Sequence, residues 1–185
     1  MTPSTADTIR DAGRHRSAAD HPGTIRAYYP FWDEQYRPFL LRAVEAFPDD
    51  RLHWKPRPEL FTAHQMILHI AEAERGWIHH VVEGGPDEEW IVPHHDPAQG
   101  WVTVVDAPDR AALLDRLETC HRATQRCFDR PEAELGRVLS RTRDDGSIQR
   151  FTLHWILDHV QEHEIHHRAQ LNVYLRLLGI EPPSI

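Results

Sequence analysis

The feature that most constrains the fold is a helical spacing of apolar residues, which recurs in four separate segments. Residues 28–47, 62–82, 109–131 and 152–178 each place apolar side chains every three or four positions, the period of an amphipathic helix. The chain lacks the regular alternation of strands and helices that is typical of a parallel sheet. We therefore expect an all-α protein, a four-helix bundle in which each helix buries one face against its neighbours.

Capping residues mark the ends of these helices. Thr62 and Gln65 have the spacing of a capping box at the start of the second helix. Asp109 and Thr152 can cap the third and fourth helices through their side-chain oxygens. Gly179, followed by two prolines, is typical of a helix C-terminus. The boundaries of three of the four helices are thus predicted by local sequence.

The segments between the helices predict how they are connected. Residues 86–108 form a long crossover with a β-like run at 101–105. A connection of this length allows the second and third helices to lie parallel. Before the last helix, Asp145-Gly146 within residues 137–151 indicates a β-hairpin.

The length of 185 residues corresponds to one domain. Residues 1–23 are polar, contain proline and glycine, and show no sustained apolar period, so we expect a flexible leader there. Residues 24–185 are then expected to form the helical domain.

Composition argues against two large classes of partner. Lys and Arg total 21 against 29 Asp and Glu, a net charge of -8, which leaves no strongly basic surface for the phosphates of a nucleic acid. The apolar runs are far shorter than the roughly 20 residues of a membrane helix, and the N-terminus lacks the apolar stretch of a secretory signal. Cys120 and Cys127 are seven apart in a predicted helix, too distant for a disulfide, and reduced thiols fit a cytoplasmic protein.

Histidine is the unusual component of the composition, with 15 residues. Several of them lie in the last predicted helix, where a rotation of about 100° per residue separates them by direction. His163 and His167 fall on or beside the apolar face, whereas His159 and His166 point toward solvent. Two imidazoles at i and i+4 can share a metal ion, although the same spacing also suits packing at the edge of the core or a solvated face.

Burial makes the pair of His163 and His167 costly unless something bridges them. Two adjacent imidazoles repel each other when protonated and leave nitrogens unsatisfied when neutral. A metal ion would remove this cost and would need a third ligand from another helix. His69, in the middle of the second helix and at the edge of its apolar stripe, is the best-placed candidate. Surface positions near the helix ends are expected for His64, His79 and His80.

Two runs of sequence resemble a known family. They are TAHQMILHIAEAERGW in the second helix, preceded by a WxPxP-like loop, and LHWILDHVQEHEIHHRAQLNVYLRLLGIEPP near the end of the chain. Over residues 28–183 the chain resembles the DinB-like, or DinB/YfiT-like, family of metal-binding helical bundles. In that family three histidines bind a divalent metal, and the matching positions here are His69, His163 and His167. Ala169 stands where the family usually has glycine, which leaves the implied ligands unchanged.

The resemblance implies one divalent metal ion and a reaction on a small molecule. Three imidazoles accept zinc, nickel, iron or manganese, of which zinc and nickel are preferred here. The family includes metal-dependent hydrolases and transferases that conjugate small cytoplasmic thiols, so a thiol-dependent S-transferase or a hydrolase is expected. The resemblance also implies a homodimer. The alternative is a non-enzymatic metal-binding or stress-response protein in which the metal is structural.

The histidine pair also matches short protease signatures. The run from His163 through Glu164 to His167 has the form HExxH, and residues 159–163 have the form HxxEH. The extended metzincin form would need a further histidine at the position of Val173. We therefore expect no proteolysis.

Two acidic residues and four tryptophans have less specific expected roles. Glu164 lies on the apolar arc of the last helix, where it either orients a histidine, which we favour, or acts as a general base beside the metal. Glu74 faces the apolar side of the second helix and is expected to pair with an inward arginine such as Arg168. Packing in the core or at its rim is expected for Trp32, Trp77, Trp101 and Trp155.

Overall fold

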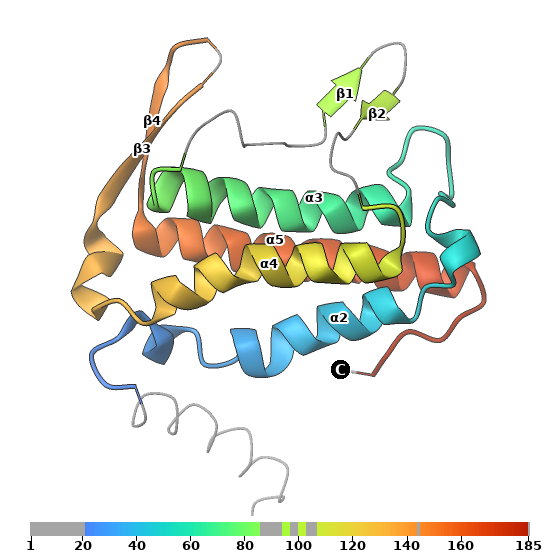
Figure 1. Cartoon of the computed structure of the whole chain (residues 1–185), viewed down its shortest axis with the longest axis horizontal. Coiled ribbons are helices and arrows are strands. Elements are labelled where there is room, and N and C mark those ends of the chain that lie inside the picture. The colour runs from blue at the N-terminus through green and yellow to red at the C-terminus, as the bar shows by residue number, and fades with distance from the viewer. Residues whose placement is uncertain (1–20, 86–93, 97–99, 103–106, 144, 185) are drawn as a thin grey trace, which may run out of the picture.

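The computed structural model is mostly helical and, over the residues that it describes, has four α-helices and two short hairpins (Figure 1). It describes residues 21–85, 94–96, 100–102, 107–143 and 145–184. The helices are α2 (Arg37–Glu45), α3 (Ala63–Arg75), α4 (Arg110–Phe128) and α5 (Leu153–Leu177). The helical spacing of apolar residues therefore predicted the dominant secondary structure correctly.

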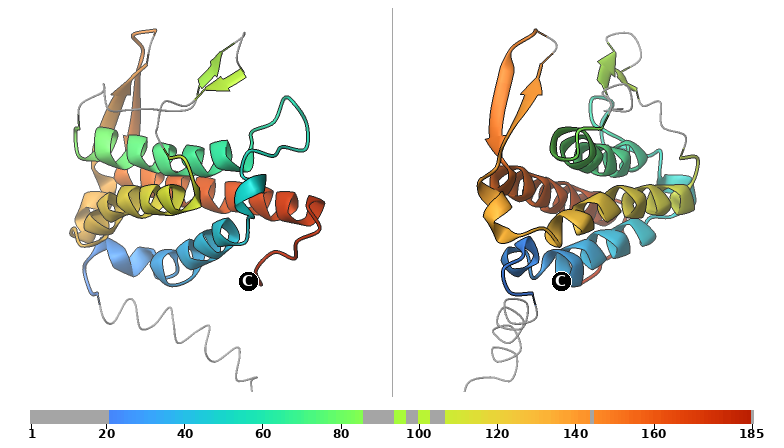
Figure 2. Two further views of the ribbon diagram at one scale, coloured as in Figure 1. Left: turned by 45° about the vertical axis from the view of Figure 1, so that its right-hand side comes forward. Right: turned by 60° about the vertical axis from the view of Figure 1, so that its left-hand side comes forward.

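The four helices lie side by side along the long dimension of the molecule (Figures 1 and 2). Helix α3 packs against α4 and α5, and α2 packs against α5 and α4. Figure 1 shows α3 and α4 running in one direction and α2 and α5 running in the other. The parallel pair requires the long connection between α3 and α4, because the chain must return to the same end before α4 begins.

The first helical segment differs from the single regular helix that its apolar spacing predicts. It consists of a 3-10 turn (Ile25–Tyr28), a π-helical turn (Trp32–Tyr36) and then α2. Pro38, in the first turn of α2, accounts for the wide turn, since proline offers no N–H to the carbonyl four residues earlier and its ring clashes with that carbonyl. The N–H of Tyr36 instead bonds the carbonyl five residues back.

The second helical segment begins with the predicted capping box. The Thr62 hydroxyl accepts from the N–H of Gln65, and the Gln65 side chain accepts from the N–H of Thr62. After α3 the segment continues as a π-helical stretch, Gly76–Val82, to the predicted end. Gly84 follows with φ of 75°, a left-handed conformation that glycine adopts without strain.

Helices α4 and α5 begin where their N-terminal caps predict, and α5 ends just before the predicted Gly179. The Asp109 carboxylate accepts from the N–H of Ala112, and the Thr152 hydroxyl accepts from the N–H of Trp155. At the end of α5, Gly179 has φ of 76°, and its N–H and that of the next residue bond carbonyls of the last turn. This arrangement is a Schellman motif, which satisfies carbonyls that would otherwise lack partners.

The two hairpins extend past α3, away from α2 (Figure 2). The strands pair antiparallel, β3 (Val138–Thr142) with β4 (Ile148–Thr152) and β1 (His94–Asp96) with β2 (Gly100–Val102). The first pair confirms the hairpin predicted at Asp145-Gly146. Strand β2 overlaps the predicted β-like run, whose residues 103–105 lie outside the described residues.

Two other expectations concern the chain as a whole. Residues 1–20 lie outside the described part of the chain, so the leader over residues 1–23 stays a prediction. None of the helices that the structure describes is long and apolar enough to cross a membrane.

Two apolar clusters fill the space between the helices. The first includes one large side chain from each helix, namely Leu40, Ile67, Leu113 and Leu171. The second, toward the other end of the molecule, includes Trp32, Ile78, Phe128 and Leu157. All four helical segments contribute to both clusters, so each segment crosses from one cluster to the other at its middle.

A buried network of charged side chains lies between the two apolar clusters. In each helical segment, the residue that joins this network lies between residues of the first cluster and residues of the second. Arg37 Nη1 lies 3.2 Å from Glu74 Oε2 and 2.8 Å from Glu164 Oε2, and Arg37 Nη2 donates to the carbonyl of Leu117. Arg37 extends from α2 and therefore contacts α3, α5 and α4 at once. Glu74 pairs with an inward arginine, as predicted, but that arginine is Arg37 rather than Arg168. Arg37 lies between Glu74 and Glu164 and binds both carboxylates.

His121 on α4 extends this network. Its Nδ1 lies 2.6 Å from Glu74 Oε1, and its Nε2 lies 2.7 Å from Asp33 Oδ1. Burial by itself lowers the pKa of His121, but the Glu74 and Asp33 carboxylates raise it to about 9. Burial likewise tends to raise the pKa of Glu74, but His121 and Arg37 lower it to about 2. Both groups are therefore charged near neutral pH.

Replacing Arg37 should destabilise the protein strongly. Arg37→Met should lower the free energy of unfolding by about 3–5 kcal/mol, because Glu74 and Glu164 lose the cation they share while remaining buried. Arg42→Met is a matched control, since Arg42 is exposed on the same helix and its loss should cost less than about 1 kcal/mol. Urea denaturation measures both values, and equal effects would contradict the role of Arg37.

The raised pKa of His121 should make the protein less stable in alkaline solution. The imidazolium contributes its full stabilisation below its unfolded-state pKa of 6.5 and loses it as the pH rises through about 9. Glu74 contributes fully above its unfolded-state pKa of 4.5. Urea denaturation across pH should show the largest gap between wild type and His121→Gln from pH 4.5 to 6.5, decreasing toward pH 9. A gap that widens above pH 7 would contradict this assignment.

Candidate metal centre

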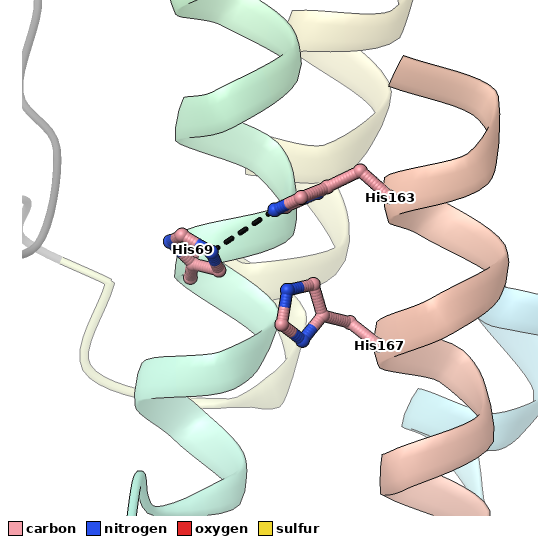
Figure 3. Close-up of side chains that lie close together, drawn as sticks. All are labelled: His69, His163 and His167. Carbon is pink, nitrogen blue, oxygen red and sulfur yellow. Dashed lines mark hydrogen bonds between the residues drawn. The ribbon is translucent and has the colours of Figure 1, made fainter. Parts of the chain in front are cut away.

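Three histidines meet where α3 packs against α5. His69 extends from α3, and His163 and His167 extend from α5, with their rings turned toward one another (Figure 3). One ring nitrogen of each lies within 4.8 Å of the other two. In the part of the chain that the structure describes, no other trio of His, Cys, Asp or Glu side chains offers three ligand atoms this close together.

Helix geometry explains how the three rings converge. His163 and His167 are one helical turn apart, so both leave α5 from the same face. His69 is half-buried at the edge of the apolar stripe of α3. The structure thus brings together the three residues that the spacing and the family motif indicated, and their binding of a metal stays a prediction.

Burial keeps the three imidazoles neutral. Desolvation, with a contribution from His167, lowers the pKa of His69 to about 4. Desolvation and the neighbouring imidazoles lower the pKa of His163 to about 3, and desolvation also lowers the pKa of His167. Near neutral pH each ring therefore carries one proton and one lone pair, and a neutral imidazole is the form that ligates a metal.

The contacts within the cluster fit a metal ligand set. His163 Nε2 and His69 Nε2 lie 3.0 Å apart, so that one of them donates to the other (Figure 3). His69 Nδ1 is buried and has no hydrogen-bond partner among the described residues. Three neutral imidazole nitrogens held this close together are a donor set that zinc and related divalent ions accept.

A comparison with protein families decides the family of this chain. The sequence model of the DinB family matches residues 21–185. The chain belongs to the DinB family. This confirms the resemblance that the two sequence runs indicate. Among curated proteins, none matches the chain.

Two crystal structures of DinB-like proteins are similar to this DinB-family chain in fold. YjoA from Bacillus subtilis has 23% sequence identity and a TM-score of 0.57, over 80% of this chain and 91% of that one. A DinB-like protein from Bacillus cereus ATCC 10987 has 15% identity and a TM-score of 0.60, over 88% of this chain and 98% of that one. At these identities the similarity concerns the fold alone.

A glutamine in the C-terminal DinB-like run also contacts the cluster. Gln170 Oε1 lies 2.7 Å from His167 Nδ1, and Gln170 Nε2 lies 3.1 Å from His166 Nε2. Sequence reasoning assigned no role to Gln170. Its position three residues after His167 on a helix is the signal that indicates such a contact.

The two histidines of α5 that were expected to face solvent have different surroundings. His166 is exposed, as predicted. His159 is half-buried, and its ring stacks on Trp155 with centroids 4.9 Å apart. The centroid of His159 also lies 6.2 Å from that of His163. The angular position of His159 on the helix does not account for Trp155, one turn earlier, whose ring covers part of the imidazole.

Two histidines that were expected at the surface are buried. His64 Nε2 lies 2.7 Å from the carbonyl of Ala107, and His80 Nδ1 lies 3.3 Å from the carbonyl of Gly85. The expectation was wrong because the segments that follow the second helical stretch return to cover both rings. His79 is half-buried.

Glu164 serves the histidine cluster in neither of the two expected ways. Its buried carboxylate accepts from Arg37 and, at 3.3 Å, from Trp32 Nε1. Burial raises the pKa of Glu164, although the nearby Arg37 opposes the change. Adjacent residues on a helix point about 100° apart, so Glu164 faces the interior while His163 faces His69. Glu164 therefore neither orients one of the three histidines nor lies where it could act as a general base beside them.

The tryptophans pack as predicted where the structure describes their side chains. Trp32 is fully buried in the second apolar cluster. Trp77 and Trp155 lie at the rim with ring centroids 5.5 Å apart, and Phe151 stacks on Trp155 at 4.4 Å. The side chain of Trp101 lies outside the described residues.

Alanine variants test the ligand set directly. His69→Ala, His163→Ala and His167→Ala should each abolish stoichiometric binding of zinc or nickel, because each removes one of three convergent nitrogens. His159→Ala and His166→Ala are the matched controls on α5 and should retain one ion per chain. Calorimetric titration of the untagged protein measures the stoichiometry. Loss of the ion in His166→Ala and its retention in His167→Ala would show that the helix phase is wrong.

Proposed function

We propose that this DinB-family protein is a metal-dependent enzyme that acts on a small molecule, as a thiol-dependent S-transferase or as a hydrolase. The observation that carries the proposal is the convergence of His69, His163 and His167 as neutral nitrogen donors. Zinc or nickel is the proposed ion, and three imidazoles also accept iron or manganese. Three protein ligands leave a coordination position for a substrate atom.

In the proposed reaction the metal ion supplies Lewis acidity, and the substrate supplies the thiol. A divalent ion supplies Lewis acidity, which lowers the pKa of a water or thiol toward neutrality. The thiol of a transfer reaction would come from the substrate, because the two cysteines of the chain are unsuited to the task. Cys120 and Cys127 are buried, and burial raises their pKa values to about 12 and about 11.

The position of Glu164 supports a small-molecule reaction over proteolysis. A protease with the HExxH signature uses its glutamate as a general base beside the metal. In this chain the Glu164 carboxylate lies in the core, where Arg37 and Trp32 bind it. The HExxH spacing therefore lacks the base on which proteolysis depends.

The non-enzymatic alternative is a metal-binding or stress-response protein with a structural metal. A protein of that kind loses its fold when the ion is removed, because the ion contributes folding energy. Here two apolar clusters and the network around Arg37 connect all four helices independently of the histidine cluster. This supports a fold that survives metal removal and thus favours the enzyme.

The proposal also includes the architecture and the setting of the protein. The cyclic contacts of α2, α5, α3 and α4 support a four-helix bundle of the DinB/YfiT-like type. The family resemblance and the bulky apolar residues of the first helical segment support a homodimer. The buried, unpaired thiols support a cytoplasmic location, and the net charge of -8 supports the absence of a nucleic-acid partner.

Metal removal and restoration test the proposed activity. Chelated protein should neither conjugate small thiols to a chromogenic electrophile nor hydrolyse small esters or amides, and one equivalent of zinc or nickel should restore one of these activities. His163→Ala should stay inactive with the ion, because it lacks a ligand, whereas His166→Ala should stay active. Far-UV circular dichroism should not change on chelation. Unfolding on chelation would favour the structural alternative, and chelator-sensitive cleavage of casein would contradict the choice of substrate class.

A further inference from the structure

The contact between Gln170 and His167 determines which nitrogen of that imidazole carries the proton. A neutral imidazole has one N–H and one lone pair, and an amide oxygen can only accept. Because Gln170 Oε1 lies 2.7 Å from His167 Nδ1, the proton is on Nδ1 and the lone pair is on Nε2.

The lone pair of His167 is directed at the other two histidines. Figure 3 shows one ring nitrogen of His167 facing His69 and His163 and the other pointing away from them. Gln170 binds Nδ1, so the nitrogen that faces the cluster is Nε2. His69 and His163 also direct their Nε2 atoms inward, which are 3.0 Å apart. The bond from Gln170 thus leaves the Nε2 lone pair of His167 directed at the Nε2 atoms of His69 and His163.

The Gln170 amide also contacts the exposed ring of His166. Rotation of the amide by 180° would exchange its oxygen and nitrogen and present an N–H to His167 Nδ1. In the observed orientation Gln170 Nε2 donates to His166 Nε2 at 3.1 Å. Gln170 lies four residues after His166 and three after His167, so a helix brings both rings within its reach. His166 itself lies outside the cluster of His69, His163 and His167.

The support of His167 contrasts with that of His69. His69 Nδ1 is buried without a hydrogen-bond partner among the described residues, so the contact of its Nε2 with His163 and packing against neighbours such as Phe61 position that ring. The ring of His167 has a hydrogen-bond acceptor that selects both its tautomer and its rotation. A hydrogen bond to the non-ligating nitrogen of a histidine is a common way to orient a metal ligand.

We propose that Gln170 is a positioning residue of the metal centre, which holds His167 as the Nδ1–H tautomer with Nε2 directed at the ion. The inference rests on the proposed metal site and adds the residue that prepares one of its ligands. Gln170 would touch neither the ion nor the substrate, so its effect passes through His167.

Three variants test the proposal. Gln170→Leu removes the acceptor and keeps a side chain of similar size, and Gln170→Glu keeps an acceptor for the His167 N–H. Gln161→Leu is the matched control, because Gln161 lies on the same helix and lines a separate cavity with Tyr28 and Tyr36. Competition with a chromogenic chelator measures the Kd for Zn²⁺. Nitrogen-15 NMR of the histidine rings in metal-free protein reports the tautomer of His167.

Gln170→Leu should bind Zn²⁺ about 10- to 100-fold more weakly than wild type, and the Nδ1–H tautomer of His167 should no longer predominate. Gln170→Glu should recover both properties, and Gln161→Leu should keep both. Wild-type affinity or an unchanged tautomer in Gln170→Leu would overturn the proposal, as would a failure of Gln170→Glu to recover. If wild type itself does not bind Zn²⁺, the proposed function fails, while the NMR measurement still tests the control of the tautomer by Gln170.

Discussion

A single buried guanidinium connects the four helices of this protein, and its pairing constrains how they can pack. Arg37 extends from α2 to Glu74 on α3, to Glu164 on α5 and to a backbone carbonyl of α4. Burial of apolar surface is non-directional, whereas a buried charge that loses its partner costs several kcal/mol. The helices are therefore held in one register, with an apolar cluster on either side of the charged layer.

This register also brings the histidines together. His69 lies five residues before Glu74 on α3, and His167 lies three residues after Glu164 on α5. Because α3 and α5 run in opposite directions, both steps lead toward the same end of the molecule (Figure 1). At a rise of about 1.5 Å per residue they differ by only about 3 Å, so pairing the carboxylates at Arg37 brings the imidazoles to a similar level.

One short run of α5 contributes side chains both to the buried ion network and to the histidine cluster. Adjacent residues on a helix diverge by about 100°, so His163 faces His69 while Glu164 faces Arg37. One turn later His167 returns to the cluster, and Gln170 reaches back to its Nδ1. Residues 163–167 match the HExxH protease signature in sequence, yet Glu164 lies in the ion network. A motif thus specifies chemistry only when the directions of its side chains are known.

The sequence by itself determined the features that depend on interactions within a few residues. The caps at Thr62, Asp109 and Thr152, the hairpin before α5 and the common face of His163 and His167 follow from backbone hydrogen bonding and helical periodicity, which act over one or two turns. Tertiary structure decided the partner of each buried charge, the burial of histidines by distant segments and the level at which α3 meets α5. Those outcomes depend on residues far apart in the chain, such as Arg37, which no local spacing relates to Glu74 or Glu164 until the helices pack.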